Sequence, residues 1–454
     1  MTMPSLERLA DVVSAHTAPA VRLSGVVAGA TASERRVRGL SDHAALGDQL
    51  LIEHRDGTAR AEVVRIDREY VVAAPYERRS CAFLGARATL DGGVALRPSQ
   101  GWLGRVVDAL GRPIDDRGIL PAGAVRGVDR DPPRPLSRVP LTRALRTGVI
   151  AVDIFAPLVE GQRVGVFAGS GVGKSTLIGM IAAASSFDVV VAALVGERGR
   201  EVAEMLSGPL AAHRDRTVTV VATGDETPMM RRLAPLTAMT IAEHFRDAGR
   251  RVLLIVDSLT RFAHAARDVA LAAGEPAVSR GYPPSVFSDM TRLVERAGRA
   301  DGAGSVTAVL SVLVDGDDLD EPVADAARGT LDGHIVLSRA IAEAGRYPSL
   351  DPLASLSRLA DRAFRPDELE LARRLKSLIA RYEDTRDLRL LGGGKPGSDP
   401  DLDRAVEIVP RLYDAMAQPP TAPKSEDAFA ELAALLAARG AGGSSANDRA
   451  ATSA

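Results

Sequence analysis

The chain has 454 residues, a length that predicts two or three domains. Of these residues 46% are hydrophobic and 26% charged, a balance that is typical of a folded globular protein. Its formal net charge of −2 argues against a domain built mainly to hold nucleic acid or an anionic membrane surface, and we expect no specific nucleic-acid partner. Its single cysteine, Cys81, excludes an intrachain disulfide, and no stretch of about 18 apolar residues predicts a transmembrane helix.

The N-terminal part predicts a short helix followed by a small β-barrel. We assign residues 1–20 to the helix. Short β-rich runs separated by turn residues fill residues 21–96, and several short strands at regular spacing favour a barrel. The pair Asp56-Gly57 is typical of a hairpin turn between two of these runs. The predicted strands lie at 21–27, 49–53, 61–66 and 70–73.

The middle of the chain predicts an α/β sheet. Residues 101–140 are rich in Gly, Pro and Arg, and we interpret them as a linker with turns. From about residue 141 to residue 362, apolar strand-like runs alternate with helical patterns, of which 228–248 is the clearest. This alternation predicts a doubly wound, mostly parallel sheet that binds its ligands beyond the carboxyl ends of the strands. The predicted strands lie at 164–167, 188–195, 217–222, 252–256, 306–314 and 335–337.

Helical patterns dominate the chain after Pro366. They lie at 367–382, 402–416 and 428–439, with a loop at 392–400. The last residues are mostly Gly, Ser, Ala and Asn, a composition that predicts a disordered tail. The predicted domains are the helix at 1–20, the barrel at 21–96, the α/β core at 97–365, a helical domain at 366–439 and the tail at 440–454.

The strongest local signal is a glycine-rich sequence between a strand-like run and a helical run. Residues 168–175 read Ala-Gly-Ser-Gly-Val-Gly-Lys-Ser, in which small residues let successive backbone N–H groups point at one anion. The pattern is typical of a phosphate-binding loop, in which Lys174 reaches the terminal phosphates and Ser175 ligates Mg²⁺. Ala168 stands where Gly is usual, so a glycine-rich turn without a ligand is the alternative. The predicted nucleotide-binding residues are Gly169, Ser170, Gly171, Val172, Gly173, Lys174, Ser175 and Thr176.

Charged residues at four further positions are candidates for the chemistry. Asp257 ends an apolar strand-like run, where a carboxylate either holds Mg²⁺ beside the loop or caps the next turn. Glu197 follows another such run and either polarises an attacking water or lies on a solvated turn. In the first case Arg198 could orient the Glu197 carboxylate. Arg358 lies in a short loop and is either a surface residue or an arginine finger.

Five long sequence strings resemble motifs of the catalytic branch of the rotary ATPase superfamily, and they occur in the same order as in that family. The similarity is greatest to the flagellar and type III secretion export ATPases, and it extends over about residues 20–417. It implies a P-loop (RecA-like), mostly parallel sheet core, an N-terminal small β-barrel and a C-terminal helical domain. In this family alanine is ordinary at the first position of the loop. The strings are residues 165–177, 196–202, 280–287, 314–318 and 331–339.

The resemblance implies a role for each matching residue in ATP hydrolysis. Glu197 matches the catalytic glutamate, and Arg198 matches its neighbour in the same string. Lys174 and Ser175 match the groups that bind phosphate and Mg²⁺. Asp257 ends the second nucleotide-binding strand of the family.

Three more residues match family positions around the nucleotide. Arg261 matches an arginine on the side of the γ-phosphate, and Tyr347 matches the aromatic residue that stacks on adenine. Arg358 matches the finger that enters the site of the adjacent subunit. Because one chain carries both Glu197 and Arg358, head-to-tail contacts between copies build a site at every interface, and we predict a homohexameric ring.

The implied function is Mg²⁺-dependent ATP hydrolysis that energises flagellar protein export, in the cytoplasm and beside an export gate on the inner face of the membrane. The string at 397–403 favours the flagellar branch over the virulence-secretion branch. The implied partners are a stator-like regulatory protein at residues 1–20, a central-stalk-like protein in the pore, and export chaperones and substrates. A bare helical cap on the barrel is the alternative for residues 1–20. A synthase catalytic subunit, a ring-shaped RNA helicase and a regulatory subunit without turnover are the other classes left open.

Overall fold

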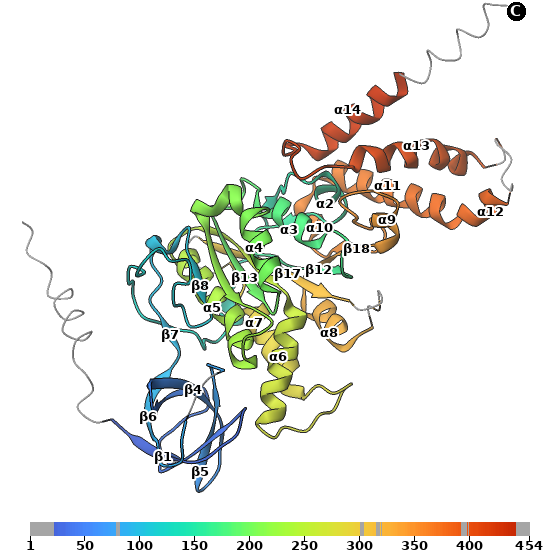
Figure 1. The fold of residues 1–454 in the computed structure, drawn as a ribbon. Coiled ribbons are helices and arrows are strands. Elements are labelled where there is room, and N and C mark those ends of the chain that lie inside the picture. The colour runs from blue at the N-terminus through green and yellow to red at the C-terminus, as the bar shows by residue number, and fades with distance from the viewer. Residues whose placement is uncertain are drawn as a thin grey trace, which may run out of the picture. The chain divides into compact units, whose positions relative to one another are not determined.

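The structure is a computed structural model that describes residues 22–78, 82–299, 304–314, 318, 320–391, 397 and 399–441. The chain forms two compact units, Met1–Val94 and Ala95–Ala454, coloured from blue to red along the sequence in Figure 1. The predicted helix at 1–20, Cys81 and most of the predicted tail lie outside the described residues, as do residues 315–317 and 398 of two motif strings. The predicted limits of the smaller domains remain predictions.

The first unit contains a closed β-barrel, which confirms this part of the predicted fold. Alternate strand residues fill its interior, among them Val27, Leu50 and Val71. The predicted hairpin is correct, since His54 pairs with Gly57 across the turn. The strands, in their order around the barrel, are β1 (Ser24–Ala30), β2 (Arg35–Arg38), β5 (Tyr70–Pro75), β4 (Gly57–Ile66), β3 (Asp48–His54) and β6 (Arg87–Gly93).

Two barrel strands, β2 and β6, were not predicted from the sequence. The sequence of β2 is Arg-Arg-Val-Arg, and that of β6 ends in Asp-Gly-Gly. Both are poor in the β-branched and aromatic residues that mark a strand, and pairing with their neighbours stabilises them instead.

The second unit is built on a nine-stranded sheet, which confirms the predicted mostly parallel core. The strands run in the order β19-β18-β12-β17-β15-β13-β14-β8, and β16 pairs with β17 beside this path. All neighbours are parallel except at β19 and β16. The strands are β8 (Val106–Asp108), β12 (Arg163–Ala168), β13 (Val189–Val195), β14 (Thr217–Ala222), β15 (Arg251–Asp257), β16 (Gly298–Arg299), β17 (Ser305–Leu313), β18 (Gly333–Leu337) and β19 (Leu356–Ser357).

Strand β8 corrects the interpretation of residues 101–140 as a linker. It pairs in parallel with β14 and so extends the central sheet at its edge. The ion pair between Arg105 and Asp115, at 2.8 Å, fixes the chain on either side of it. A strand of three residues is too short to show a period in the sequence, and only its contact with β14 makes it part of the core.

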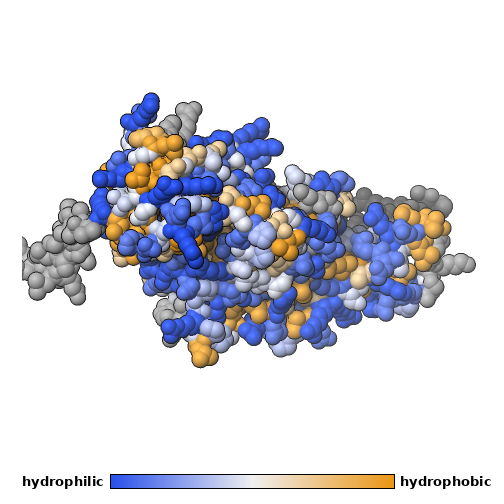
Figure 2. All heavy atoms as spheres, turned by 90° about the horizontal axis from the view of Figure 1, so that it is seen from below, coloured by the Kyte–Doolittle hydropathy of each residue, from blue (hydrophilic) through white to orange (hydrophobic). Residues whose placement is uncertain are grey.

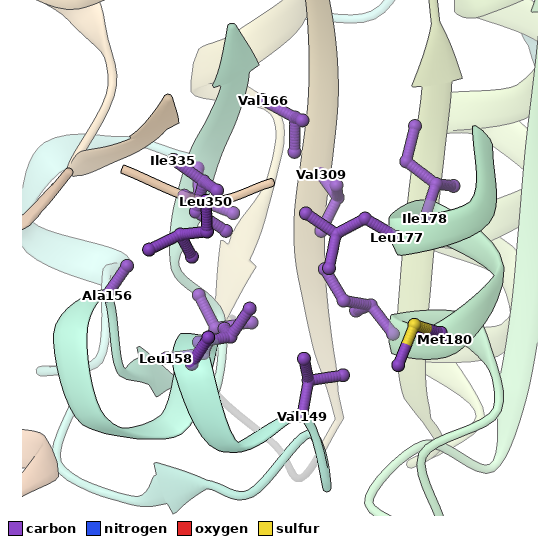
Figure 3. Close-up of a cluster of buried hydrophobic side chains, with 14 of the residues drawn as sticks. Val149, Ala156, Leu158, Val166, Leu177, Ile178, Met180, Val309, Ile335 and Leu350 are labelled. Atoms are coloured by element: carbon purple, nitrogen blue, oxygen red, sulfur yellow. The ribbon is translucent and has the colours of Figure 1, made fainter. Parts of the chain in front are cut away.

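Helices cover both faces of this sheet. On one face α5 (Pro228–Asp247), α6 (Leu259–Ala272) and α8 (Pro322–Thr330) contact the central strands. On the other face α3 (Lys174–Ala182) packs Leu177 and Ile178 against the sheet in one buried cluster. In Figure 3 Leu177 of this helix points toward Val309, and Val166 lies on the neighbouring strand. The core therefore fixes the helix that follows the glycine-rich loop.

The predicted C-terminal helical region is confirmed. It contains α11 (Pro366–Asp384), α12 (Arg386–Leu390), α13 (Pro400–Met416) and α14 (Ala428–Ala441). Helices α11 and α13 contact each other, and Leu375 and Leu412 join the same buried cluster as the α/β core. The remaining α-helices and strands are α2 (Ile150–Phe155), α4 (Gly199–Ser207), α7 (Pro284–Glu295), α9 (Arg339–Glu343), α10 (Ala360–Ala363), β7 (Ala95–Leu96), β9 (Arg126–Gly127), β10 (Ala144–Leu145) and β11 (Leu158–Val159).

Among the helices within the described ranges, none has both the length and the apolar character that crossing a bilayer requires. The face shown in Figure 2 mixes blue hydrophilic residues with smaller orange groups of hydrophobic residues.

Candidate active site

The glycine-rich loop has the geometry of a phosphate cradle. Strand β12 ends at Ala168, and α3 begins at Lys174, so the loop is held between two rigid elements. Gly171 and Gly173 have positive φ values of 78° and 94°, which residues with a Cβ rarely adopt. The start of α3 directs unpaired backbone N–H groups and a partial positive charge at this loop.

The loop forms one wall of a cavity of about 430 Å³, large enough for a nucleotide. Most of the predicted site residues line it, although they come from three separate segments of the chain. Three do not: Val172 is buried beneath the loop, and Tyr347 and Arg358 lie elsewhere. The predicted residues in the lining are Gly169, Ser170, Gly171, Gly173, Lys174, Ser175, Thr176, Glu197, Arg198, Asp257 and Arg261.

Lys174 joins two carboxylates at the bottom of this cavity. Its ammonium forms a close ion pair with Asp257, which ends β15, and its Nζ lies 3.8 Å from Glu197 Oε1. Ser311 Oγ, fully buried in β17, donates a 2.6 Å hydrogen bond to Asp257 Oδ1. The parallel register brings these groups together, because the carboxyl ends of β12, β13 and β15 meet at one edge of the sheet.

Glu197 follows β13 and has an unusual proton affinity. Burial raises the pKa of its carboxyl to about 7, and a hydrogen bond with Glu201 acts in the same direction. The preceding residue, Gly196, has a φ of 70°, and a Cβ there would stand 3.1 Å from Arg261. Glycine therefore lets Arg261 approach the turn that carries Glu197. A carboxyl with a pKa near 7 is suited to accept a proton at neutral pH.

Glu201 and Ser311 are site residues that sequence reasoning missed. Glu201, on α4, shares a hydrogen bond with Glu197, and this bond lowers the pKa of Glu201. The sequence did contain a signal for Glu201, because this residue stands four positions after Glu197 at the start of a helix. The exposed Arg198 side chain pairs with Glu201 at 3.6 Å, and its predicted role in orienting Glu197 remains a prediction. Ser311 stands inside an apolar strand, where a single serine carries no signal.

The donor groups in the cavity fit Mg²⁺. Asp257 offers a carboxylate and the exposed Ser175 a hydroxyl, and hard oxygen donors of this kind are those that Mg²⁺ prefers. Asp257 already holds a cation, the Lys174 ammonium, at this position. Within the described ranges, no group of three or more His, Cys, Asp or Glu residues could hold a metal by itself. An ion at Asp257 and Ser175 would be held by these two protein groups and by the substrate's phosphates.

Tyr347 lies beside the glycine-rich loop, outside the main cavity. Its ring is 3.4 Å from the point where a Cβ on Gly173 would stand, and the residue is 45% exposed. It lines a second, smaller pocket together with Pro348 and Tyr413, the latter from α13. The ring is therefore close enough to the loop to contact a base, and its predicted role in stacking on adenine remains a prediction.

Arg358 lies at the edge of the sheet, directly after β19. Its side chain is exposed and does not line the cavity of its own chain. One guanidinium nitrogen donates to the carbonyl oxygen of Arg328 at 2.9 Å, and the backbone N–H donates to that of Asp332 at 2.9 Å. Its predicted role as an arginine finger for the adjacent copy remains a prediction.

A glycine-rich loop with its lysine, a strand-end aspartate and a doubly wound sheet define a P-loop nucleotide-binding protein. The sequence profile of the ATP synthase alpha/beta family, nucleotide-binding domain, matches residues 148–357. The profile of the T3SS EscN ATPase C-terminal domain matches residues 364–434.

Known proteins resemble the chain over almost all of its length. The flagellum-specific ATP synthase of Rhizobium meliloti (strain 1021) is 51% identical, over 97% of this chain and 95% of that protein. The assembled ATPase EscN of the enteropathogenic E. coli type III secretion system is 39% identical, with a TM-score of 0.85 over 91% of this chain and all of EscN. EscN in complex with its central stalk EscO matches with a TM-score of 0.83, at 38% identity over 91% of this chain and 100% of that one.

The chain belongs to the ATP synthase alpha/beta family, in the group of flagellum-specific ATP synthases and type III secretion ATPases. The resemblance predicted from its five motif strings is confirmed.

Proposed function

We propose that the chain is the Mg²⁺-dependent ATPase of a flagellar type III protein export apparatus. The observation that carries this proposal is the convergence of Lys174, Glu197 and Asp257 in one cavity beside the glycine-rich loop. The flagellar branch is supported by the greater identity to the flagellum-specific relative, 51%, than to EscN, 39%.

In the proposed mechanism the chain positions the γ-phosphate and activates the attacking water. The loop N–H groups and the Lys174 ammonium bind the phosphates. Glu197 accepts a proton from the water as the water oxygen bonds to the γ-phosphorus, while the bond from that phosphorus to the β–γ bridging oxygen breaks and ADP leaves. Asp257 and Ser175 hold Mg²⁺, which supplies positive charge to the phosphate oxygens when it is bound. Arg261 lines the same cavity and faces the charge that develops there.

The proposed assembly is a homohexameric ring with a site at each interface. It is supported by the exposed position of Arg358, outside the cavity of its own chain. It is also supported by the similarity to EscN, whose solved structure is that of the assembled ATPase. In such a ring Arg358 completes the site of the next copy, and a head-to-tail contact that closes on itself repeats the site at every interface.

The proposed partners follow from the same group of proteins. A central-stalk-like protein would occupy the pore, by analogy with EscO in its complex with EscN. A stator-like protein at residues 1–20, and export chaperones and substrates at the helical domain, complete the proposal. The proposed place of action is the cytoplasmic face of the membrane, beside an export gate.

A second candidate is the ATPase of a virulence-type type III secretion system. It is favoured by the match of residues 364–434 to the EscN C-terminal domain profile. Proteins that copurify with the chain from its native cell separate the two branches. Flagellar chaperones would support the first proposal, and effector chaperones would support the second.

The proposed activity predicts phosphate release from ATP that depends on Mg²⁺ and on assembly. Purified protein should release phosphate from MgATP, and EDTA should stop the release because Asp257 and Ser175 then hold no ion. Turnover per chain should rise with protein concentration, since a lone copy has no finger in its site. Absence of turnover at every concentration would contradict the proposal and favour a nucleotide-binding regulatory subunit.

The proton affinity of Glu197 predicts the pH dependence of catalysis. A general base must be deprotonated, and burial raises the pKa of Glu197 to about 7. The value of kcat/KM, which reports the free enzyme, should therefore rise about tenfold between pH 6 and pH 8. The Glu197→Gln variant is the control and should show low activity without this rise. A flat profile for the natural protein would contradict the assignment of Glu197 as the base.

A further inference from the structure

The arginine finger is carried by a short segment at the edge of the sheet. Strand β19 has only two residues, Leu356 and Ser357, and pairs with β18 alone. Gly333 makes this pairing possible, because a Cβ at that position would stand 2.6 Å from the Leu356 carbonyl oxygen. A two-residue edge strand cannot hold a long side chain in place by backbone pairing alone.

Buried polar contacts fix both ends of this segment to the α/β core. At one end the Ser355 hydroxyl, which is buried, accepts a 3.0 Å hydrogen bond from the N–H of Val336 in β18. At the other end the Ser357 hydroxyl accepts a 3.1 Å hydrogen bond from the side-chain amide of Gln162, a fully buried residue just before β12. The segment before Arg358 is therefore tied to two neighbouring strands.

A third contact comes from the C-terminal helical region. Lys376 of α11 donates a 2.8 Å hydrogen bond from Nζ to the Ser355 carbonyl oxygen. The lysine is half-buried, and this burial lowers the pKa of its ammonium, while nearby Asp351 acts in the opposite direction. Burying part of an ammonium costs free energy, and its hydrogen bond to the Ser355 carbonyl oxygen offsets this cost, so the contact ties this carbonyl to α11.

We propose that Lys376 positions the arginine finger, by holding the Ser355–Arg358 segment against α11 so that Arg358 points at the nucleotide of the adjacent copy. Lys376 does not line the nucleotide cavity of its own chain and contacts the segment that carries Arg358, so we assign it as a positioning residue. Through this contact a shift of α11 relative to the sheet reaches the finger three residues further along the chain. The inference rests on the proposed function, since it requires sites that two copies share.

The Lys376→Met variant tests this role. It keeps the volume of the side chain and removes the donor, so the finger should be misplaced while the cavity of the same chain stays intact. We expect kcat to fall between about tenfold and about a hundredfold, as small misplacements of catalytic groups do, with the KM for MgATP within about twofold. The Lys376→Arg variant retains a donor and should recover part of the loss. An unchanged kcat in Lys376→Met would overturn the inference.

Mixed rings separate a finger defect from a general one. A finger-defective chain still offers an intact loop, so mixing Lys376→Met with Lys174→Ala protein should restore turnover, and mixing it with Arg358→Ala protein should not. Recovery with Arg358→Ala, or with neither partner, would mean that Lys376 serves its own loop or only the fold, and the inference would be wrong.

Two controls make this result specific. Lys424→Met removes another half-buried lysine that donates to a carbonyl, that of Met180 at 2.7 Å, but on the helix of its own loop. Any turnover that Lys424→Met loses should return on mixing with Arg358→Ala protein and not on mixing with Lys174→Ala protein. This is the opposite of the pattern expected for Lys376→Met.

The mixture of Glu197→Gln and Arg358→Ala proteins is the reference that shows whether subunits exchange between rings and share sites. If that pair shows no recovery while subunits demonstrably exchange, the proposed shared site itself fails, and the inference fails with it.

Discussion

Replacing Lys174 with alanine should abolish ATP hydrolysis while the chain still folds. The Lys174 ammonium lies between Asp257 and Glu197 in the nucleotide cavity, where it would face the terminal phosphates. Removing a preorganised positive charge from a site of this kind costs at least about 10³-fold in turnover. Phosphate release from MgATP measures the loss directly.

Packing that does not involve the Lys174 side chain should preserve the fold of this variant. Helix α3 keeps its buried contacts through Leu177 and Ile178, and Asp257 keeps its hydrogen bond from Ser311. Circular dichroism and the melting temperature should therefore stay close to those of the natural protein. Lys424→Ala removes a lysine that also contacts α3 but lies outside the cavity lining, and it should retain turnover within about tenfold. Substantial hydrolysis by Lys174→Ala would contradict the assignment of the cavity as the ATP site.

The sequence was most informative where the residues that form one feature are adjacent along the chain. The glycine-rich loop, its strand and its helix are adjacent along the chain, so the cradle and its position at the sheet edge could be predicted together. Asp257 could be predicted for the same reason, because an apolar strand that ends in a carboxylate is a local pattern. The parallel sheet then brings separate strand ends to one edge without further information.

What the sequence could not predict depends on contacts between distant residues. Ser311 lies 54 residues from Asp257, and Lys376 lies 21 residues from Ser355, and no periodicity links either pair. Strand β8 is too short to show a pattern, and its place in the sheet depends on β14. Such groups are specified by three-dimensional packing, which a single sequence does not display.

Replacing Arg358 with alanine should lower turnover by about 10³-fold to 10⁵-fold, the range found for arginine fingers supplied by a neighbouring subunit. The residue is exposed and outside its own cavity, so its loss should leave the fold and nucleotide binding in the same chain nearly unchanged. A loss of folding instead would indicate that its hydrogen bond to Arg328, at 2.9 Å, is structural.

Mixing two inactive variants tests whether the site is shared. Glu197→Gln protein keeps its finger, and Arg358→Ala protein keeps its loop and its base, so an interface is intact only where the second variant supplies the cavity and the first supplies the finger. Random assembly of equal amounts places about one quarter of the interfaces in this order, so turnover should return to about a quarter of the natural value if sites act independently. Mixing Glu197→Gln with Lys174→Ala is the matched control, and it should recover nothing because both defects lie in the same cavity. Recovery in the control would show that Glu197 and Lys174 act in different sites. Recovery in neither mixture, despite exchange of subunits, would show that each copy contains its whole site.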